Sequence, residues 1–350
     1  MATPHIDPGE IAALKRLAAG IMNVQGNRFI KDLLRTKNIR IGNNKEEFKV
    51  NLEGAIDAGQ ITSADVAQWL NSVEGWGNQH VYLFNISTTL RKELTEPKIH
   101  QRVIDSGLAP LWEADTTFAF PDQPTLTSIS YIDSILRIVW HESSPGWVRA
   151  PEKDIPPKDE GLDVFEYRAY RKVERRAITR FEAHVKPGIA GLFIADPIEG
   201  DEHQKAIIEA KRVIALLTNL KALEKGEMDI GSISRNLDQK NVPKNNLAPA
   251  VKTQRSRLSS GAAYVEFAAN SSGKAYWEEP AIQDVRKSVR AEQLQAFQGA
   301  EGVFIFQETK EGLDRPLRVQ LYGKDNRIRL WAQMEAFEVW NILTQLSQYQ

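Results

Sequence analysis

Cysteine is absent from this chain of 350 residues. Its absence excludes disulfide bonds, iron–sulfur clusters, thiolate zinc sites and a cysteine nucleophile. Long apolar runs are missing as well, since no stretch approaches the ~18 residues that a membrane-spanning helix needs. The opening residues, Met-Ala-Thr-Pro-His-Ile-Asp-Pro, also lack the basic and apolar regions of a secretory signal. Together these absences predict a soluble, cytoplasmic protein with no membrane partner.

Local patterns for metal or nucleotide chemistry are scarce too. The six histidines are scattered, and no two have the spacing of zinc ligands on one helix or strand. No glycine-rich phosphate loop of the nucleotide-binding types occurs. We therefore expect no metal, no cofactor and no catalytic residue.

What the chain does contain is clustered positive charge, although its net charge is only −1. Residues 28–49 carry seven Lys or Arg against three acids, residues 163–186 seven against four, and residues 235–258 six against one. Such clusters attract anions locally even when the whole protein is nearly neutral. Glutamates alternate with the cations of residues 163–186, so we expect cross-strand ion pairs there.

The amino-terminal part has the signals of a small helical domain. Asp7-Pro8-Gly9-Glu10 is typical of a helix start, and a second helix is predicted over Arg28–Lys37. Asn44 can cap a third helix, and Thr62-Ser63-Ala64-Asp65 resembles a capping box that opens a fourth. We therefore predict a compact domain of four helices over residues 1–77.

Beyond residue 77 the pattern changes to strands with a few helices between them. A segment with four prolines, residues 142–163, reads as a linker or long surface loop. The expected units are a connecting α/β segment over residues 78–150 and a body domain over residues 151–350. Strands grouped in runs favour an α+β fold with a largely antiparallel sheet. The predicted strands are Val81–Ile86, Ile132–Trp140, Phe165–Tyr170, Arg176–Val185, Gly191–Ala195, Ala263–Ala268, Val303–Gln307, Leu317–Tyr322 and Arg327–Gln333, and the predicted helices are 201–225, 282–297 and 335–349.

Within the helical domain one motif has a possible counterpart among known proteins. It comprises Leu33 and Leu34, the turn Ile39-Arg40-Ile41-Gly42-Asn43-Asn44, Lys45, and a helix that carries Phe48 and Leu52. This order resembles the SAP family of DNA-binding modules, in which a leucine-rich helix precedes a glycine-containing turn and a lysine opens a second helix. The resemblance covers about 25–45 residues and departs from the family where Arg-Gly-Leu is usual. It implies a helix–turn–helix-like module that binds DNA.

The cations of this segment and the exposed amides at a helix start suit phosphate oxygens. A second basic segment is expected as a loop over residues 238–260. It could follow a groove of the nucleic acid, and its affinity for the nucleic acid would fall as the salt concentration rises. The candidate nucleic-acid-binding residues are Arg28, Lys31, Arg35, Lys37, Arg40, Asn43, Asn44, Lys45, Lys49, Lys240, Lys244, Lys252, Arg255 and Arg257. The leading interpretation is a non-enzymatic DNA-binding protein that contacts the duplex backbone without reading its sequence.

Two other interpretations stay open. The protein could be an adaptor that binds proteins and has no nucleic-acid role, and the last helix with Trp340 could form either core or a dimer seam. A metal-dependent nuclease is the third interpretation. Glu308 and Lys310 would share a face of a strand, and Glu266 could add a carboxylate from the preceding strand.

Overall fold

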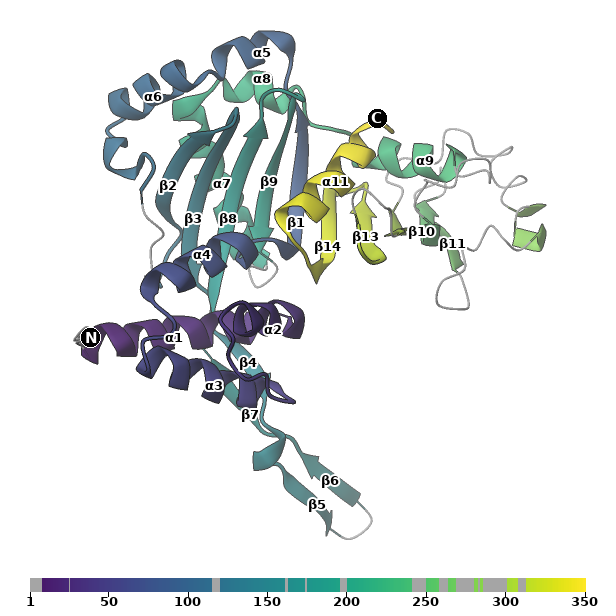
Figure 1. Cartoon of the computed structure of the whole chain (residues 1–350). Helices are drawn as coiled ribbons and strands as arrows, with labels where there is room; N and C mark the ends of the chain where they lie inside the picture. Colours follow the sequence, from purple (N-terminus) through teal and green to yellow (C-terminus); the bar gives the residue numbers. More distant parts are fainter. Residues whose placement is uncertain are drawn as a thin grey trace.

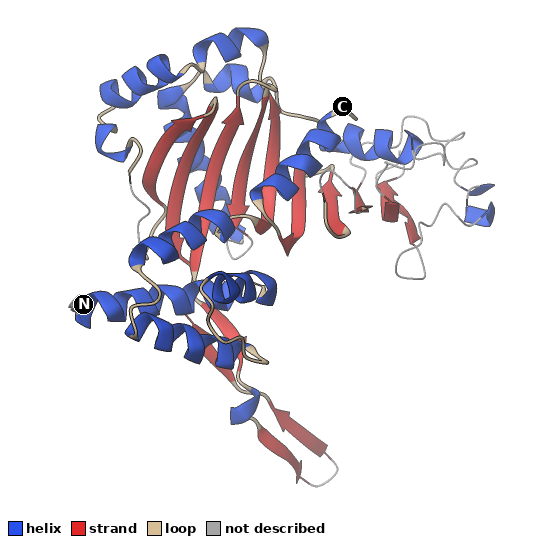
Figure 2. Ribbon diagram, viewed as in Figure 1, coloured by secondary structure: helices blue, strands red, loops and turns tan. Residues whose placement is uncertain are grey.

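The structure is a computed structural model, and it describes most of the chain. The described residues are 8–24, 26–114, 120–160, 163–173, 175–195, 200–240, 250–257, 264–268, 280–282, 284–285, 301–307 and 313–350. Figures 1 and 2 show a helical module, a broad sheet with helices on both faces, and a narrow ribbon that projects below the module.

The four predicted helices of the amino-terminal module are confirmed. They are α1 (Pro8–Val24), α2 (Asn27–Thr36), α3 (Lys45–Asp57) and α4 (Ser63–Val73). Asn44 caps α3, because its Oδ1 accepts a hydrogen bond from the Glu47 backbone N–H at 2.9 Å. Thr62 and Asp65 form the expected capping box of α4. The apolar stripes of all four helices meet in one core around the fully buried Phe48.

The body is built on one ten-stranded sheet in which all neighbouring strands are antiparallel. Its strands are β1 (Gly77–Asn85), β2 (Thr125–Ile132), β3 (Ile135–Ser143), β8 (Arg176–His184), β9 (Ile189–Ala195), β10 (Ala250–Arg257), β11 (Tyr264–Ala268), β12 (Glu301–Phe306), β13 (Leu317–Tyr322) and β14 (Arg327–Gln333). Their spatial order is β11-β10-β12-β13-β14-β1-β9-β8-β3-β2. Together with the amino-terminal helical module, this sheet forms the α+β fold that the sequence predicts. The expected boundary at residue 150 falls between β3 and β8 in the chain, and these two strands pair with each other along their length in the sheet.

The two halves of the sheet are covered on opposite faces. Helices α5 (Thr88–Glu93), α6 (Glu96–Asp105), α7 (Gly200–Leu217) and α8 (Leu220–Glu224) form one core with β1, β2, β3, β8 and β9. Helices α9 (Ile230–Lys240) and α11 (Ala336–Ser347) form a second core on the other face, against β12, β13, β14 and β1. In Figure 1, α11 lies in front of the sheet and α7 behind it. Apart from the shared strands β1 and β9, the helices of one core therefore do not extend over the strands of the other core.

The prediction of a linker over residues 142–163 is wrong. The segment starts a ribbon in which β4 (Gly146–Arg149) pairs with β7 (Tyr170–Val173) and β5 (Ile155–Glu160) pairs with β6 (Asp163–Tyr167), with a short helical turn, η2 (Pro151–Lys153), between β4 and β5. Prolines are tolerated here because Pro156 and Pro157 lie at the register shift of β5, where no ladder hydrogen bond is needed. The strand expected over Phe165–Tyr170 is accordingly divided between β6 and β7.

Two further expectations need correction. The loop predicted over residues 238–260 is a strand at 250–257, because β10 pairs with both β11 and β12. The helix predicted over residues 201–225 breaks at Asn219, whose side chain caps α8. Lys244, Glu308, Lys310 and most of the helix predicted over residues 282–297 lie outside the described residues. Within the described part of the chain, no helix is long and apolar enough to span a membrane.

Candidate nucleic-acid interface

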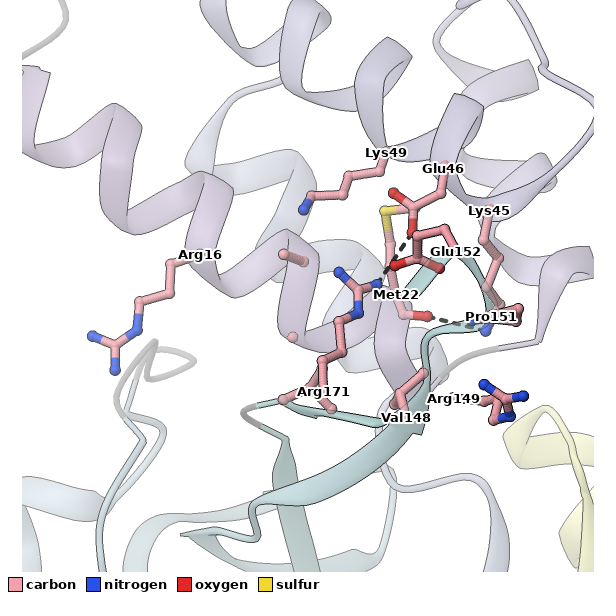
Figure 3. A pocket seen from close by; sticks show the side chains of 13 residues that line it. Arg16, Met22, Lys45, Glu46, Lys49, Val148, Arg149, Pro151, Glu152 and Arg171 are labelled. Atoms are coloured by element: carbon pink, nitrogen blue, oxygen red, sulfur yellow. Dashed lines mark hydrogen bonds and ion pairs between the residues drawn. The ribbon is translucent and has the colours of Figure 1, made fainter. Parts of the chain in front are cut away.

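A crevice of about 800 Å³ separates helices α1 and α3 from the β4–β7 ribbon. Its cationic residues are Arg16, Lys45, Lys49, Arg149 and Arg171, and we call this set the basic crevice. Two acids, Glu46 and Glu152, are among its described lining residues. In Figure 3, Arg16 and Arg149 lie at opposite ends, with the other three cations between them. The positive groups thus form a row rather than a ring around one point.

Lys45 connects the crevice to the predicted helix start. It is the first residue of α3, directly after the Asn44 cap. Its Nζ donates a hydrogen bond to the Met22 backbone oxygen at 3.2 Å. Much of its side chain is exposed, but partial burial of the ammonium lowers the pKa of Lys45. An anion beside this ammonium would favour its charged form.

The ribbon arginines are held by exposed acidic partners. Arg171 Nη2 lies 3.2 Å from Glu46 Oε1, and both side chains are about half exposed or more. Arg149 pairs with Asp154 and donates to the Ala169 backbone oxygen at 3.0 Å. Exposed ion pairs of this kind contribute roughly 0–1 kcal/mol to the stability of the fold. Exchanging the Glu46 carboxylate for a ligand anion would therefore cost little.

The two other cations come from the helices. The Arg16 guanidinium lies 5.4 Å from the centre of the Phe120 ring, which gives it a cation–π contact. Lys49 follows Lys45 by one helical turn on α3 and lies 3.8 Å from Glu53. The spacing of four residues places both lysines on the same side of α3, where they face the ribbon.

The structure assigns other roles to several predicted site residues. Arg28 forms ion pairs with Asp314 at 2.9 Å and Glu335 at 3.5 Å, so it ties the helical module to the body. Lys37 pairs with Asp65, and this contact lowers the pKa of the carboxyl group. These two cations already take part in structural contacts.

The remaining predicted residues of the module lie outside the crevice lining. Arg35 pairs with Asp32 at 2.9 Å, and Lys31 Nζ lies 5.7 Å from the centre of the Phe48 ring. The Asn43 backbone N–H donates to Glu47 Oε2 at 3.0 Å, which stabilises the turn. Arg40 is exposed on this turn.

The second basic segment does not join the crevice. Lys252, Arg255 and Arg257 belong to β10, and Lys240 ends α9. Figure 1 shows α9 and β10 beside the far end of the sheet, away from α3 and the ribbon. The elements that carry the second basic segment therefore do not border the crevice.

Three of the five crevice residues were missed at the sequence level. Arg16 lies in an apolar helix, Arg149 in the supposed linker, and Arg171 in the segment interpreted as ion-paired strands. Within the segment, Glu166 pairs with Arg168, two positions along the chain, at 2.9 Å. The cross-strand partner of Glu182 on β8 is Arg137 on β3, at 2.5 Å, which lies outside the segment. A cluster whose residues extend from Arg16 to Arg171 in the chain leaves no local signal.

Buried charges connect the module and α11 to the same sheet. Arg176 Nε donates to Glu74 Oε1 at 2.7 Å, and both side chains are buried. Trp340 is partly buried against the second core, and its Nε1 donates to Glu182 Oε2 at 2.8 Å. Burial alone would raise the pKa of Glu182, but Arg180 and the surrounding donors lower it to about 2. This carboxylate therefore remains ionised inside the protein.

The nuclease constellation is not assembled within the described residues. Glu266 lies on β11, and β10 separates this strand from β12. No group of three or more His, Asp or Glu side chains in the described part of the chain could hold a metal ion.

The fold and the site together define an α+β protein with an amino-terminal helical module and a basic crevice at its junction with a projecting ribbon. No protein-family model matches the chain, and no curated protein matches it.

Proposed function

We propose that this protein binds duplex DNA through the basic crevice, by contacts with the phosphate backbone. The observation that carries the proposal is the convergence of five cations from four elements, α1, α3, β4 and β7, on one crevice. Such an arrangement supplies electrostatic attraction that is independent of base sequence. The proposed role needs neither a catalytic residue nor a cofactor.

The shape of the cluster favours a polyanion over a small anion. A single phosphate would be best held by cations around one point, whereas this row extends from Arg16 to Arg149. Successive phosphates could each meet one cation along the row. Binding would exchange the exposed Arg171–Glu46 pair for an Arg171–phosphate contact and would leave the buried network of Glu74 and Arg176 intact. The resemblance to SAP modules supports the same location, because Lys45 opens α3.

The test is fluorescence anisotropy with the full chain and a labelled duplex of about 25 base pairs at about 50 mM salt. Wild-type protein should bind, and the triple variant Arg16→Gln, Lys45→Gln, Lys49→Gln should bind at least tenfold more weakly. Lys92→Gln is the matched control, because this exposed lysine lies on α5, outside the crevice. It should leave binding unchanged.

The variant Arg40→Gln distinguishes binding at the crevice from binding at a SAP-type surface on the exposed turn. The crevice proposal predicts no loss for this variant, since Arg40 is not a lining residue. No binding by wild-type protein would reject the proposal. Equal losses for the triple variant and for Lys92→Gln would reject the assigned location.

A second candidate function, protein binding, is favoured by the ribbon. Its exposed apolar and aromatic side chains are Trp147, Ile155, Phe165, Tyr167 and Tyr170, with exposed fractions of 42–67%. Exposed apolar groups gathered on one projecting element are typical of an interaction surface. Light scattering of the purified chain would test self-association. A dimer that becomes monomeric in Trp147→Ser, with DNA binding retained, would support this role.

A further inference from the structure

The carboxy-terminal half of the sheet has a face that no helix of the described chain covers with apolar side chains, and no step of the proposed function uses it. Side chains alternate along β12, β13 and β14, and one set, including Val319, Leu321 and Leu330, lies buried under α9 and α11. The core under α5–α8 contains no described residue of β12, β13 or β14. Among the described residues, therefore, neither helix-covered core extends over the opposite face of these strands, where Arg318 and Trp331 are exposed. Its members, which we call the arginine–aromatic face, are Arg318, Gln320, Tyr322, Arg327, Arg329 and Trp331.

The side chains of this face are stacked on one another. The Arg329 guanidinium carbon lies 4.0 Å from the centre of the Trp331 ring, and that of Arg318 lies 5.4 Å from it. Arg327 makes the same kind of contact with Tyr322, at 4.8 Å. Planar guanidinium groups against aromatic rings hold both partners in defined positions.

Trp331 is the most exposed ring of the face, with 41% of its surface accessible. Its Nε1 donates a hydrogen bond to Gln320 Oε1 on the neighbouring strand at 3.2 Å. This bond satisfies the polar end of the indole and limits its rotation. An ordered ring that remains partly exposed is a preformed stacking surface.

We propose that the arginine–aromatic face binds single-stranded nucleic acid, with bases stacked on Trp331 and Tyr322 and phosphates contacted by the arginines. Stacking platforms combined with cations are the recurrent solution for single strands, because every base offers a π face. Bases of a duplex are already stacked on each other, and their faces are inaccessible. A flat sheet surface also has no protruding helix to enter a groove.

The spacing of the two rings suits separate bases. Tyr322 is opposite Arg327, and Trp331 follows Arg327 by four residues on β14. At ~3.3 Å per residue the rings are anchored roughly 13 Å apart along the strand direction. One oligonucleotide could therefore contact both rings.

Charge is distributed unevenly over the face. Asp325 pairs with Arg327 at 3.2 Å, and Glu301 is opposite Tyr322 in the ladder. The end around Trp331, Arg318 and Arg329 is the more positive one. The strongest contacts with a polyanion are expected at this end.

The test uses the full-length protein and fluorescence anisotropy with labelled oligo-dT and oligo-rU of about 15 nucleotides, at about 50 mM salt. Trp331→Ala should weaken binding of a single strand about tenfold or more. Phe337→Ala is the matched control, because this ring is 52% exposed on α11, on the other face of the sheet. It should change the affinity less than about twofold.

Arg318→Gln is a second variant at an exposed position. It tests the proposal independently if Trp331→Ala fails to fold. It should weaken binding about threefold or more, while Arg212→Gln on α7, with a side chain 65% exposed, should have no effect. A preference for oligo-dT or oligo-rU would identify the sugar that is recognised, and equal binding would show that recognition depends on stacking and charge. Both results support the proposal.

This inference does not rest on the basic crevice, and the same variants separate the two. Trp331→Ala should retain duplex binding, and the crevice triple variant should retain single-strand binding. The inference is overturned if wild-type protein fails to bind either oligonucleotide, or if Trp331→Ala and Arg318→Gln both bind as wild type does. In that case the arginines and rings only satisfy each other on the surface.

Discussion

The affinity of the basic crevice for DNA should fall with salt at a rate set by its number of cations. Each phosphate neutralised contributes about −0.9 to the slope of log K against log salt. If all five crevice cations engage one phosphate each, the slope for wild-type protein is about −4.5. Between about 50 and 200 mM salt the affinity should then fall about 500-fold.

The double variant Arg16→Gln, Lys49→Gln removes two of these contacts. Neither residue caps a helix or belongs to the buried network, so the fold should be retained. The expected slope is about −2.7, which corresponds to a fall of about 40-fold over the same range of salt. Anisotropy titrations at four salt concentrations (from about 50 to 200 mM) would measure both slopes, with Lys92→Gln as a control that should keep the wild-type slope.

Two results would refute this reasoning. A wild-type slope shallower than about −2 would mean that most of the crevice cations do not touch phosphate. An unchanged slope in the double variant, with weaker binding overall, would place the phosphates elsewhere and leave only a long-range electrostatic effect of the lost charges.

Three further predictions concern stability. Glu182→Gln should lower the free energy of unfolding at pH 7 by about 3 kcal/mol, because the pKa of Glu182 is about 2 instead of 4.5 in the folded state. Its ionised form stabilises the fold above pH 4.5 and that contribution is lost as the pH falls toward 2, so urea unfolding should show a smaller difference from wild type at pH 3. Gly77→Ala should lower the midpoint of thermal unfolding, since φ is +110° and a Cβ would lie 2.3 Å from the Ala332 backbone oxygen; an unchanged midpoint would contradict this. Asn44→Ala should cost about 1 kcal/mol by removing the cap of α3, and equal stability in urea unfolding would show that solvent satisfies the Glu47 amide equally well.

Local signals predicted the helical module well. Asn44 and the Thr62–Asp65 capping box define where two helices begin, and the apolar stripes define their buried faces. Alternation likewise located β8, β13 and β14, and a short continuous apolar run located β9. These features depend on neighbouring residues only, so the sequence contains them directly.

Features that depend on distant contacts were not predictable in this way. The prolines at 156 and 157 indicated a loop, whereas pairing across the ribbon makes strands. The basic crevice needs Arg16 and Arg171 to meet, although they are 155 positions apart in the chain. Polar and apolar residues alternate over 327–331, but only the sheet order and the packing show that the described helices leave the polar side of these strands uncovered.

The pairing of β1 with β14 at the centre of the sheet has a consequence for biosynthesis. Val81 is opposite Ile328, so a ribosome must add 247 residues after Val81 before its partner exists. At ~5–20 residues per second this takes roughly 12–50 s, and during that time one edge of β1 has no partner strand. Unpaired edges with apolar residues such as Val81 and Leu83 invite pairing with other chains. The nascent protein should therefore depend on a holding chaperone until β14 is released from the ribosome. A sheet made only of hairpins between neighbouring strands would need this protection for a shorter time.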